Sequence, residues 1–191
     1  MNQLTNLSIH NILVLKTYLQ LIFGDHYPFE IIQIINMLFY KLFNVSISCG
    51  CDHTYLVFDK ESYVWGGNEY GQLGLGHNRN RNSPHKLNLP PIQKISCGTY
   101  YSIAITTTNG VYVWGANAFG ELGLGHNQNL NSQQKLNLSP IKKISCGANH
   151  SVIIITTNEV YVWGANGSGQ LGLGHNQDQN SPQKIDFLIA S

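Results

Sequence analysis

Two different spacings of apolar residues divide this chain. In residues 8–23 and again in residues 28–43, apolar side chains recur at the period of about 3.6 residues that is typical of an amphipathic helix. Pro28 suits the first turn of the second helix, because its missing N–H has no helical partner there. We therefore expect residues 1–43 to form a helical hairpin that buries its apolar face on another part of the molecule.

After residue 44 the helical period gives way to runs rich in β-branched and aromatic residues, which predict strands. Each strong run is followed by a turn and by a second run that ends in Trp. The paired runs are 54–58 with 62–65, 101–106 with 111–114, and 151–156 with 160–163. Asn109-Gly110 lies in one of these turns and predicts a tight hairpin, since such turns need a positive φ at their centre.

Two further short strands are expected in each unit. They are the segments before Cys-Gly and the Lys-containing runs, at residues 94–97, 142–146, 85–89, 134–138 and 183–187. Four short strands in a unit of about 50 residues correspond to one blade of a β-propeller.

The same unit occurs three times. Residues 115–127 have close copies at 66–78 and 164–176, and the tryptophans at 65, 114 and 163 recur about every 49 residues. The sequence therefore predicts a mainly β protein with three propeller-type blade units preceded by an α-helical hairpin. We place the units at about residues 44–91, 92–140 and 141–191.

The glycines of the repeated stretch have a conformational role. Gly71, Gly74 and Gly76, with their copies, are expected to adopt a positive φ or to approach other backbone closely. The leucines between them, Leu73 and Leu75, are expected to point into the core. The spacing G-x-x-G-x-G is not the dinucleotide-binding pattern G-x-G-x-x-G, and recurrence argues against a single ligand site.

Composition and charge argue against several classes of function. Only 11% of the 191 residues are charged and the net charge is +1, so nucleic acid and anionic membranes are not expected partners. The arginines, Arg79 and Arg81, sit together in one loop. The apolar runs are also shorter than the roughly 18 residues of a membrane-spanning helix.

The cysteines indicate structure rather than chemistry. Cys49, Cys97 and Cys146 occupy equivalent positions of the repeat and Cys51 is the extra one, a pattern of small structural thiols rather than of a disulfide framework. No second half-site accompanies Cys49 and Cys51, so no metal is expected, and we expect no cofactor. Reduced thiols favour an intracellular location, cytoplasmic or nuclear.

At this point the sequence resembles a known family. Ser48 to Thr54, Ser145 to Ser151 and the stretch from Val162 to Gly174 are similar to the repeat of the regulator of chromosome condensation. The resemblance implies a β-propeller whose Trp and Leu residues pack between blades. The family's propeller closes with seven blades, whereas three units form an open arc. Either the hairpin caps it, or chains associate as a homo-oligomer, or the product is truncated.

The resemblance also suggests where a partner binds. The family motif's histidine falls on His53 and His150, with Tyr101 in the middle unit, and these residues either tie loops together or contact a partner. Propellers that bind proteins differentiate the loops of successive blades. The candidate partner-binding residues are Asp52, His53, Glu69, Tyr70, Arg79, Arg81, Tyr100, Tyr101, Phe119, Asn149 and His150.

No grouping of nucleophile, base and acid stands out, so we interpret the chain as a non-enzymatic protein–protein interaction module. Two alternatives remain. The family resemblance implies a guanine nucleotide exchange regulator of a small GTPase. The helix that carries Pro28, Ile31, Ile35 and Phe39 is similar to the opening of an F-box, which implies a substrate adaptor that binds a ubiquitin-ligase component.

Overall fold

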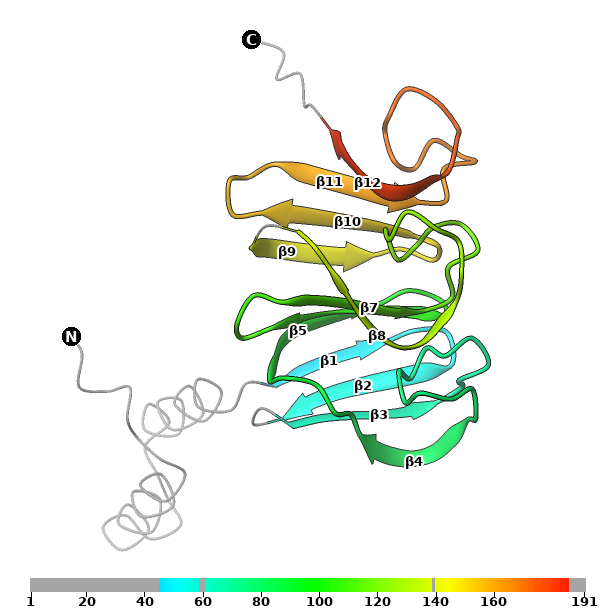
Figure 1. Ribbon diagram of the computed structural model, residues 1–191, viewed down its shortest axis with the longest axis vertical. Coiled ribbons are helices and arrows are strands. Elements are labelled where there is room, and N and C mark those ends of the chain that lie inside the picture. The colour runs from blue at the N-terminus through cyan, green and yellow to red at the C-terminus, as the bar shows by residue number, and fades with distance from the viewer. Residues whose placement is uncertain (1–44, 59–60, 139, 186–191) are drawn as a thin grey trace, which may run out of the picture. The chain divides into compact units, whose positions relative to one another are not determined.

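The computed structural model describes residues 45–58, 61–138 and 140–185, so the expected N-terminal hairpin lies outside the described residues. The described residues form three four-stranded antiparallel sheets (Figure 1). The predicted three blade units are confirmed.

Each sheet is a meander in which strands that follow one another in the sequence are hydrogen-bonded neighbours. The first sheet contains β1 (Ser46–Cys49), β2 (His53–Phe58), β3 (Glu61–Gly66) and β4 (Arg81–Lys86). The second contains β5 (Ile92–Cys97), β6 (Tyr101–Thr106), β7 (Val111–Gly115) and β8 (Leu130–Leu136). The third contains β9 (Ile141–Cys146), β10 (His150–Ile155), β11 (Val160–Gly164) and β12 (Gln179–Ile185).

The sheets stack face against face in chain order, and the first strands of successive sheets, β1, β5 and β9, approach one another (Figure 1). In every sheet the pairing of the third and fourth strands shifts register just before the terminal glycine of the third strand. A register shift bends the local backbone, and here the long glycine-rich loop leaves the sheet directly after it.

The fourth strands begin about four residues before the predicted Lys-containing runs. β4 starts at Arg81, β8 at Leu130 and β12 at Gln179, and their opening residues are mostly Asn, Ser, Gln and Pro. These residues lack the alternation that marks a half-buried strand. Each fourth strand pairs with the neighbouring third strand, and β8 and β12 also accept a backbone hydrogen bond from the preceding sheet's loop.

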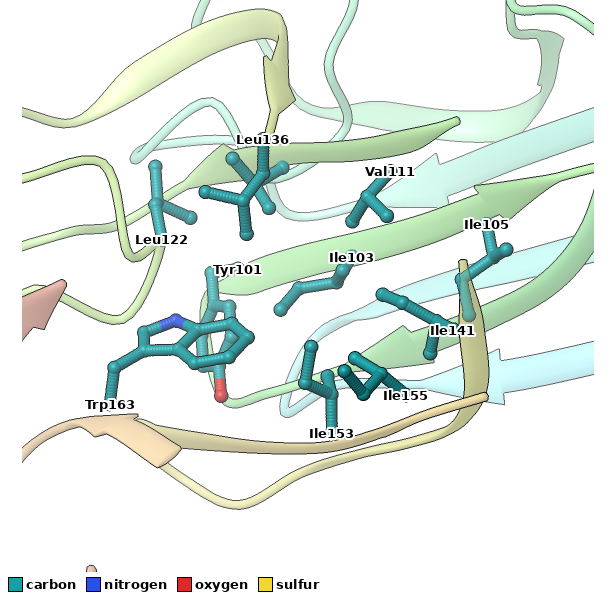
Figure 2. Close-up of a cluster of buried hydrophobic side chains, with 11 residues drawn as sticks. Tyr101, Ile103, Ile105, Val111, Leu122, Leu136, Ile141, Ile153, Ile155 and Trp163 are labelled. Carbon is teal, nitrogen blue, oxygen red and sulfur yellow. The ribbon is translucent and has the colours of Figure 1, made fainter. Parts of the chain in front are cut away.

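Two apolar layers fill the spaces between the sheets. The first joins Tyr55, Val57 and Leu73 of the first sheet to Ala104 and Trp114 of the second. Figure 2 shows the second layer, where Trp163 of β11 lies against Tyr101 of β6 and isoleucines from both sheets close the space beside them. Because fully burying one such side chain contributes roughly 1.5–3 kcal/mol, the contact between sheets is a main source of stability.

The glycine-rich loops have the predicted backbone. Gly71, Gly74 and Gly76 have φ values of +82°, +65° and +76°, and the copies in the other units agree with them. Leu73 is fully buried and Leu75 packs at the edge of the same layer. The expected inward packing of the leucines is therefore confirmed.

The hairpin turns differ in detail from the expectation. Asn109 carries the positive φ, at 62°, whereas Gly110 is not among the glycines with positive φ. Asn158 takes the same conformation in the third sheet, with φ 68°. Asn tolerates this region better than other residues with a Cβ, so the turn rests on the Asn rather than on the Gly after it.

Candidate interaction surface

The candidate residues gather at one end of the three sheets, here called the loop face. Because neighbouring strands are antiparallel, the turn between the first and second strands lies at the same end as the loop that follows the third. The loop face consists of the short turns 50–52, 98–100 and 147–149 and the long loops 67–80, 116–129 and 165–178, seen to the right of each sheet in Figure 1.

One asparagine organises each long loop. The Oδ1 of Asn68 accepts a hydrogen bond from the backbone N–H of Leu73 at 2.9 Å, and its Nδ2 donates to the carbonyl of His77 at 2.6 Å. Asn117 and Asn166 make the same contacts in the other sheets. All three asparagines are fully buried, so the loops are held from inside and present their outer residues in a fixed arrangement.

The histidines after the glycine stretch belong to the same arrangement. In each loop the imidazole Nδ1 receives a hydrogen bond of 3.2 Å from the backbone N–H two residues later. His77, His126 and His175 therefore fix the loop, as their recurrence in the sequence predicts.

An aromatic pair stands on the outer surface of the loop face. The rings of Tyr70 and Tyr100 lie 4.9 Å apart at an angle of 36°, although they come from different sheets. Tyr70 is 39% exposed, and Phe119 at the equivalent position of the next loop is 42% exposed. The third loop carries Ser168 instead, so the surface differs from one blade to the next while the interior repeats.

An acidic residue adjoins this pair. The carboxylate of Asp52 accepts a hydrogen bond from the Nε2 of Gln72 at 3.3 Å and stays partly exposed. The charged forms of Cys51 and, less, of Asp52 raise the pKa of Tyr100, as does partial burial. Glu69 is exposed beside Tyr70. The patch formed by Asp52, Glu69, Tyr70 and Tyr100 is therefore aromatic and acidic.

The basic residues lie farther along the same loop. An Nη2 of Arg81 is 2.8 Å from the Nε2 of His77, while Arg79 is exposed. Partial burial, followed by the charges of Arg81 and Arg79, lowers the pKa of His77. The lowered pKa favours the neutral ring, in which Nδ1 accepts the hydrogen bond from the backbone N–H of Arg79.

The structure places His53 and Tyr101 between sheets rather than on the surface. His53 is 2% exposed and its Nε2 lies 3.2 Å from the hydroxyl of Ser102 in the next sheet. Tyr101, fully buried, is linked in the same way to Ser151, with 3.0 Å between the two hydroxyl oxygens. Both residues therefore lack a surface that a partner could contact, and they tie neighbouring blades together.

Asp52, His53 and Ser102 have the order of a catalytic triad but not its properties. The Oδ1 of Asp52 is 3.8 Å from the Nδ1 of His53, which is longer than a hydrogen bond. Ser102 is fully buried and donates to the carbonyl of Gln72. Burial lowers the pKa of His53 to about 4, with a smaller opposing effect of Asp52. The hydrogen bond between His53 and Ser102 recurs as that between Tyr101 and Ser151, so we interpret Asp52, His53 and Ser102 as structural residues.

Asn149 of the third short turn and His150, the first residue of β10, are both half-buried. The carbonyl of His150 accepts a hydrogen bond of 2.5 Å from the hydroxyl of Tyr101. The backbone of this turn therefore belongs to the contact between the second and third sheets, while part of each side chain stays accessible.

The thiols line a shallow hollow of about 340 Å³ where the three short turns meet. Burial raises the pKa of Cys97 to about 12 and that of Cys146 to about 11, so both stay protonated at neutral pH. Cys49 and Cys51 are exposed, and all four cysteines are free. Within residues 45–185, apart from the gaps, no cluster of three His, Cys, Asp or Glu side chains could hold a metal ion.

Within the part of the chain that the structure describes, no helix is long and apolar enough to cross a membrane.

Three stacked four-stranded meanders with repeated loops at one end define a repeat protein of the β-propeller class. The regulator of chromosome condensation (RCC1) repeat matches residues 61–105, 109–154 and 157–190, and a second description of the same repeat matches 92–121 and 141–170. The chain therefore belongs to the regulator of chromosome condensation (RCC1) repeat family. The first two matches each run from the third strand of one sheet to the second strand of the next, so one sequence repeat spans the contact between two blades.

Among curated relatives, the ultraviolet-B receptor UVR8 of Arabidopsis thaliana is 41% identical over 69 residues, which are 34% of this chain and 16% of the receptor. Among solved structures, Prp20p of Saccharomyces cerevisiae matches with a TM-score of 0.69 and 23% identity, over 75% of this chain and 38% of Prp20p. Human WBSCR16 matches with a TM-score of 0.64 and 24% identity, over 74% of this chain and 39% of WBSCR16. The solved structures establish a shared fold, and the chain spans less than half of each of these proteins.

Proposed function

We propose that the chain is a protein-interaction module that contacts its partner through the loop face. The observation that carries the proposal is the exposed pair Tyr70 and Tyr100 beside Asp52, on loops that are fixed from inside. Tyrosine is enriched in protein interfaces because its ring supplies a large apolar area and its hydroxyl supplies a hydrogen bond.

Repetition and variation support the same surface. The Trp and Leu residues that pack between sheets recur in the units, whereas the exposed position two residues after the repeated Asn of each loop changes from Tyr70 to Phe119 to Ser168. A surface that differs from blade to blade can distinguish one part of a partner from another. The pre-formed pair of rings also lowers the entropy lost on binding.

The partner is a protein, and a small GTPase is one bait to test. The solved Prp20p structure is described with its binding properties to Gsp1p and histones. That description concerns Prp20p, of which this chain matches 38%. The aromatic pair of Tyr70 and Tyr100 supports a protein partner in general, since aromatic enrichment marks interfaces.

The experiment compares three forms of the full chain as affinity baits. The loop-face variant Tyr70→Ala with Tyr100→Ala removes the aromatic pair, and the control Thr107→Ala with Thr156→Ala alters exposed residues at the opposite end of the sheets. A protein captured by the wild type is purified and its Kd is measured for each form. The proposal expects a loss of at least about tenfold for the loop-face variant and an unchanged Kd for the control.

Equal affinity of the loop-face variant and the wild type would contradict the proposal. Circular dichroism melting of each variant separates this result from unfolding, because both pairs of side chains lie outside the apolar layers. A GTPase bait adds a second measurement, the rate at which bound nucleotide dissociates with and without the chain.

A further inference from the structure

The same hydrogen bond holds both pairs of neighbouring sheets. The indole N–H of Trp114 donates to the carbonyl of Gln72 at 2.9 Å, and that of Trp163 donates to the carbonyl of Glu121 at 2.6 Å. In both cases a serine hydroxyl from the tryptophan's sheet donates to the same carbonyl. One carbonyl within each of the first two glycine-rich loops, that of Gln72 or Glu121, thus accepts hydrogen bonds from the next sheet.

Two further hydrogen bonds donated by backbone N–H groups also recur between neighbouring sheets. The N–H of Gly76 donates to the carbonyl of Asn131 at 2.8 Å, and Gly125 donates to Asn180 at 2.7 Å. At the inner strands, the N–H of a cysteine donates to a serine hydroxyl of the preceding sheet at 3.0 Å, as Cys97 to Ser48 and Cys146 to Ser96. A blade is therefore recognised by a fixed set of donors and acceptors as well as by apolar packing.

Among the described residues no other sheet lies on the outer side of the first sheet, here called the front face, and this side carries the equivalent set. It includes Ile47, Cys49, Thr54, Leu56 and Trp65, which are equivalent to residues with which the second sheet meets the first. Ile47 is 66% exposed. Among the described residues nothing accepts a hydrogen bond from the Trp65 indole, whereas both equivalent indoles are fully buried and bonded.

Among the described residues no other sheet lies on the far side of the third sheet, here called the back face, and this side carries the complementary set. It includes Ser145, Val152, Ile154, Gln170 and Gly174, which correspond to residues with which the second sheet receives the third. The apolar members, Val152 and Ile154, come from β10 and are half-buried, while Leu171 of the glycine-rich loop is already buried beneath the surface.

The space beside equivalent glycines differs between the first two glycine-rich loops and the third. A Cβ on Gly71 would lie 2.4 Å from the Cα of Asn131, and one on Gly120 would lie 2.3 Å from the Cα of Asn180, because the next sheet presses on the loop. At Gly169 the nearest atom would be the Oδ1 of Asn176, at 3.5 Å. The third loop keeps the docking conformation, with φ of +73° at Gly169, and has room for another blade.

We propose that a second copy of this chain binds head to tail, with its front face on the back face of the first. The contact would reproduce those inside the molecule: the second copy's Trp65 indole on the Gln170 carbonyl, and its outer strand β4 on the loop that contains Gly174. Two copies joined in this way at both faces supply six sheets, within the roughly four to eight blades with which propellers close. Head-to-tail contacts form rings when the rotation closes.

The first experiment measures the solution mass of the full chain by light scattering over a dilution series. The wild type is expected to have about twice the chain mass of 21.3 kDa. Ile47→Asp on the front face and Ile154→Asp on the back face are each expected to give the mass of one chain. The control Phe119→Asp adds the same charge to an equally hydrophobic, exposed position of the loop face and is expected to keep the wild-type mass.

These variants distinguish the proposal from other arrangements. A front-to-front dimer would leave Ile154→Asp dimeric. A wild type of single-chain mass at every concentration would overturn the proposal. Because Phe119 belongs to the loop face and Ile47 does not, a failure here leaves the proposed partner binding untouched, and the reverse holds as well.

A cross-link tests the geometry directly. Cys97 approaches Ser48 as the second copy's Cys49 would approach Ser145, and a backbone N–H bonded to a serine hydroxyl brings the two Cα atoms within about 7 Å, the reach of a disulfide. Ser145→Cys is expected to form a disulfide-linked dimer on mild oxidation. The same variant with Cys49→Ala is expected to lose it although Cys51 remains, and an unchanged cross-link would contradict the head-to-tail register.

Discussion

At the residue scale, the links between blades depend on pairs of polar residues about 49 positions apart. His53 with Ser102 and Tyr101 with Ser151 occupy the same place in successive junctions. The sequence shows that these positions are equivalent. It does not show that His53 and Tyr101 lie against the next sheet, because the spacing of a repeat identifies equivalent residues but not which faces of the sheets are in contact. This is why His53 and Tyr101 stand among the predicted surface residues while the structure buries them.

The buried imidazole of His53 predicts a specific dependence of stability on pH. Its pKa falls from 6.5 in the unfolded chain to about 4 in the fold. The unfolded state therefore binds the proton more tightly. The contribution of His53 to the free energy of unfolding is fully present above pH 6.5 and is lost as the pH falls towards 4. The contribution of this residue is on the order of 3 kcal/mol.

His53→Tyr is expected to remove that part of the decrease, because Tyr101 already occupies the equivalent position and bonds the equivalent serine. Urea unfolding of the wild type and the variant between pH 4 and 7 measures the difference. His85→Gln, on the outer strand β4, is the control and is expected to keep the wild-type profile. Parallel profiles of wild type and His53→Tyr would show that His53 does not titrate as described.

At the element scale, the glycines of the glycine-rich loop meet two requirements. They allow positive φ values, and they leave room for close contact with the next sheet. The loop's positive φ values and inward leucines could be predicted from the repeated G-x-x-G-x-G pattern. The close contact with the next sheet could not, since it involves the polar opening residues of β8 and β12, which do not resemble a strand. The sequence therefore places the start of the fourth strand of each sheet about four residues after its start in the structure.

Three Gly→Ala substitutions distinguish the effect of a positive φ from the effect of close contact with the next sheet. Gly167 has open space and is not among the glycines with positive φ, so its substitution should change the free energy of unfolding by less than about 0.5 kcal/mol. Gly125 has open space but φ of +80°, and its substitution should destabilise the fold by about 1–2 kcal/mol. Gly120 adds a Cβ 2.3 Å from the Cα of Asn180, and overpacking of this kind costs roughly 1–3 kcal/mol more.

Chemical unfolding of the three variants gives the order of stability. The expected order is Gly167→Ala, then Gly125→Ala, then Gly120→Ala as the least stable. Equal effects at Gly120 and Gly125 would mean that the loop does not press on the next sheet.

At the scale of the whole molecule, each blade recognises the next through contacts that do not depend on which blade it is. The propeller-type architecture follows from the sequence because the repeat is long and regular. The sequence does not show what happens at the two free sides, since equivalent residues such as Cys49 and Cys97 become exposed or buried according to whether a neighbour is present. We therefore propose that the loop face, where the units differ, binds partners, and that the blade faces bind other blades.

The most direct test of this account follows the indole N–H groups of the three tryptophans by NMR hydrogen exchange at several protein concentrations. Trp114 and Trp163 should be protected at every concentration, because their acceptors lie within the same chain. Trp65 should exchange quickly when dilute and more slowly as a second copy binds. Rapid exchange at Trp114 or Trp163 would contradict the packing of the blades, and exchange at Trp65 that does not change with concentration would contradict recognition between copies.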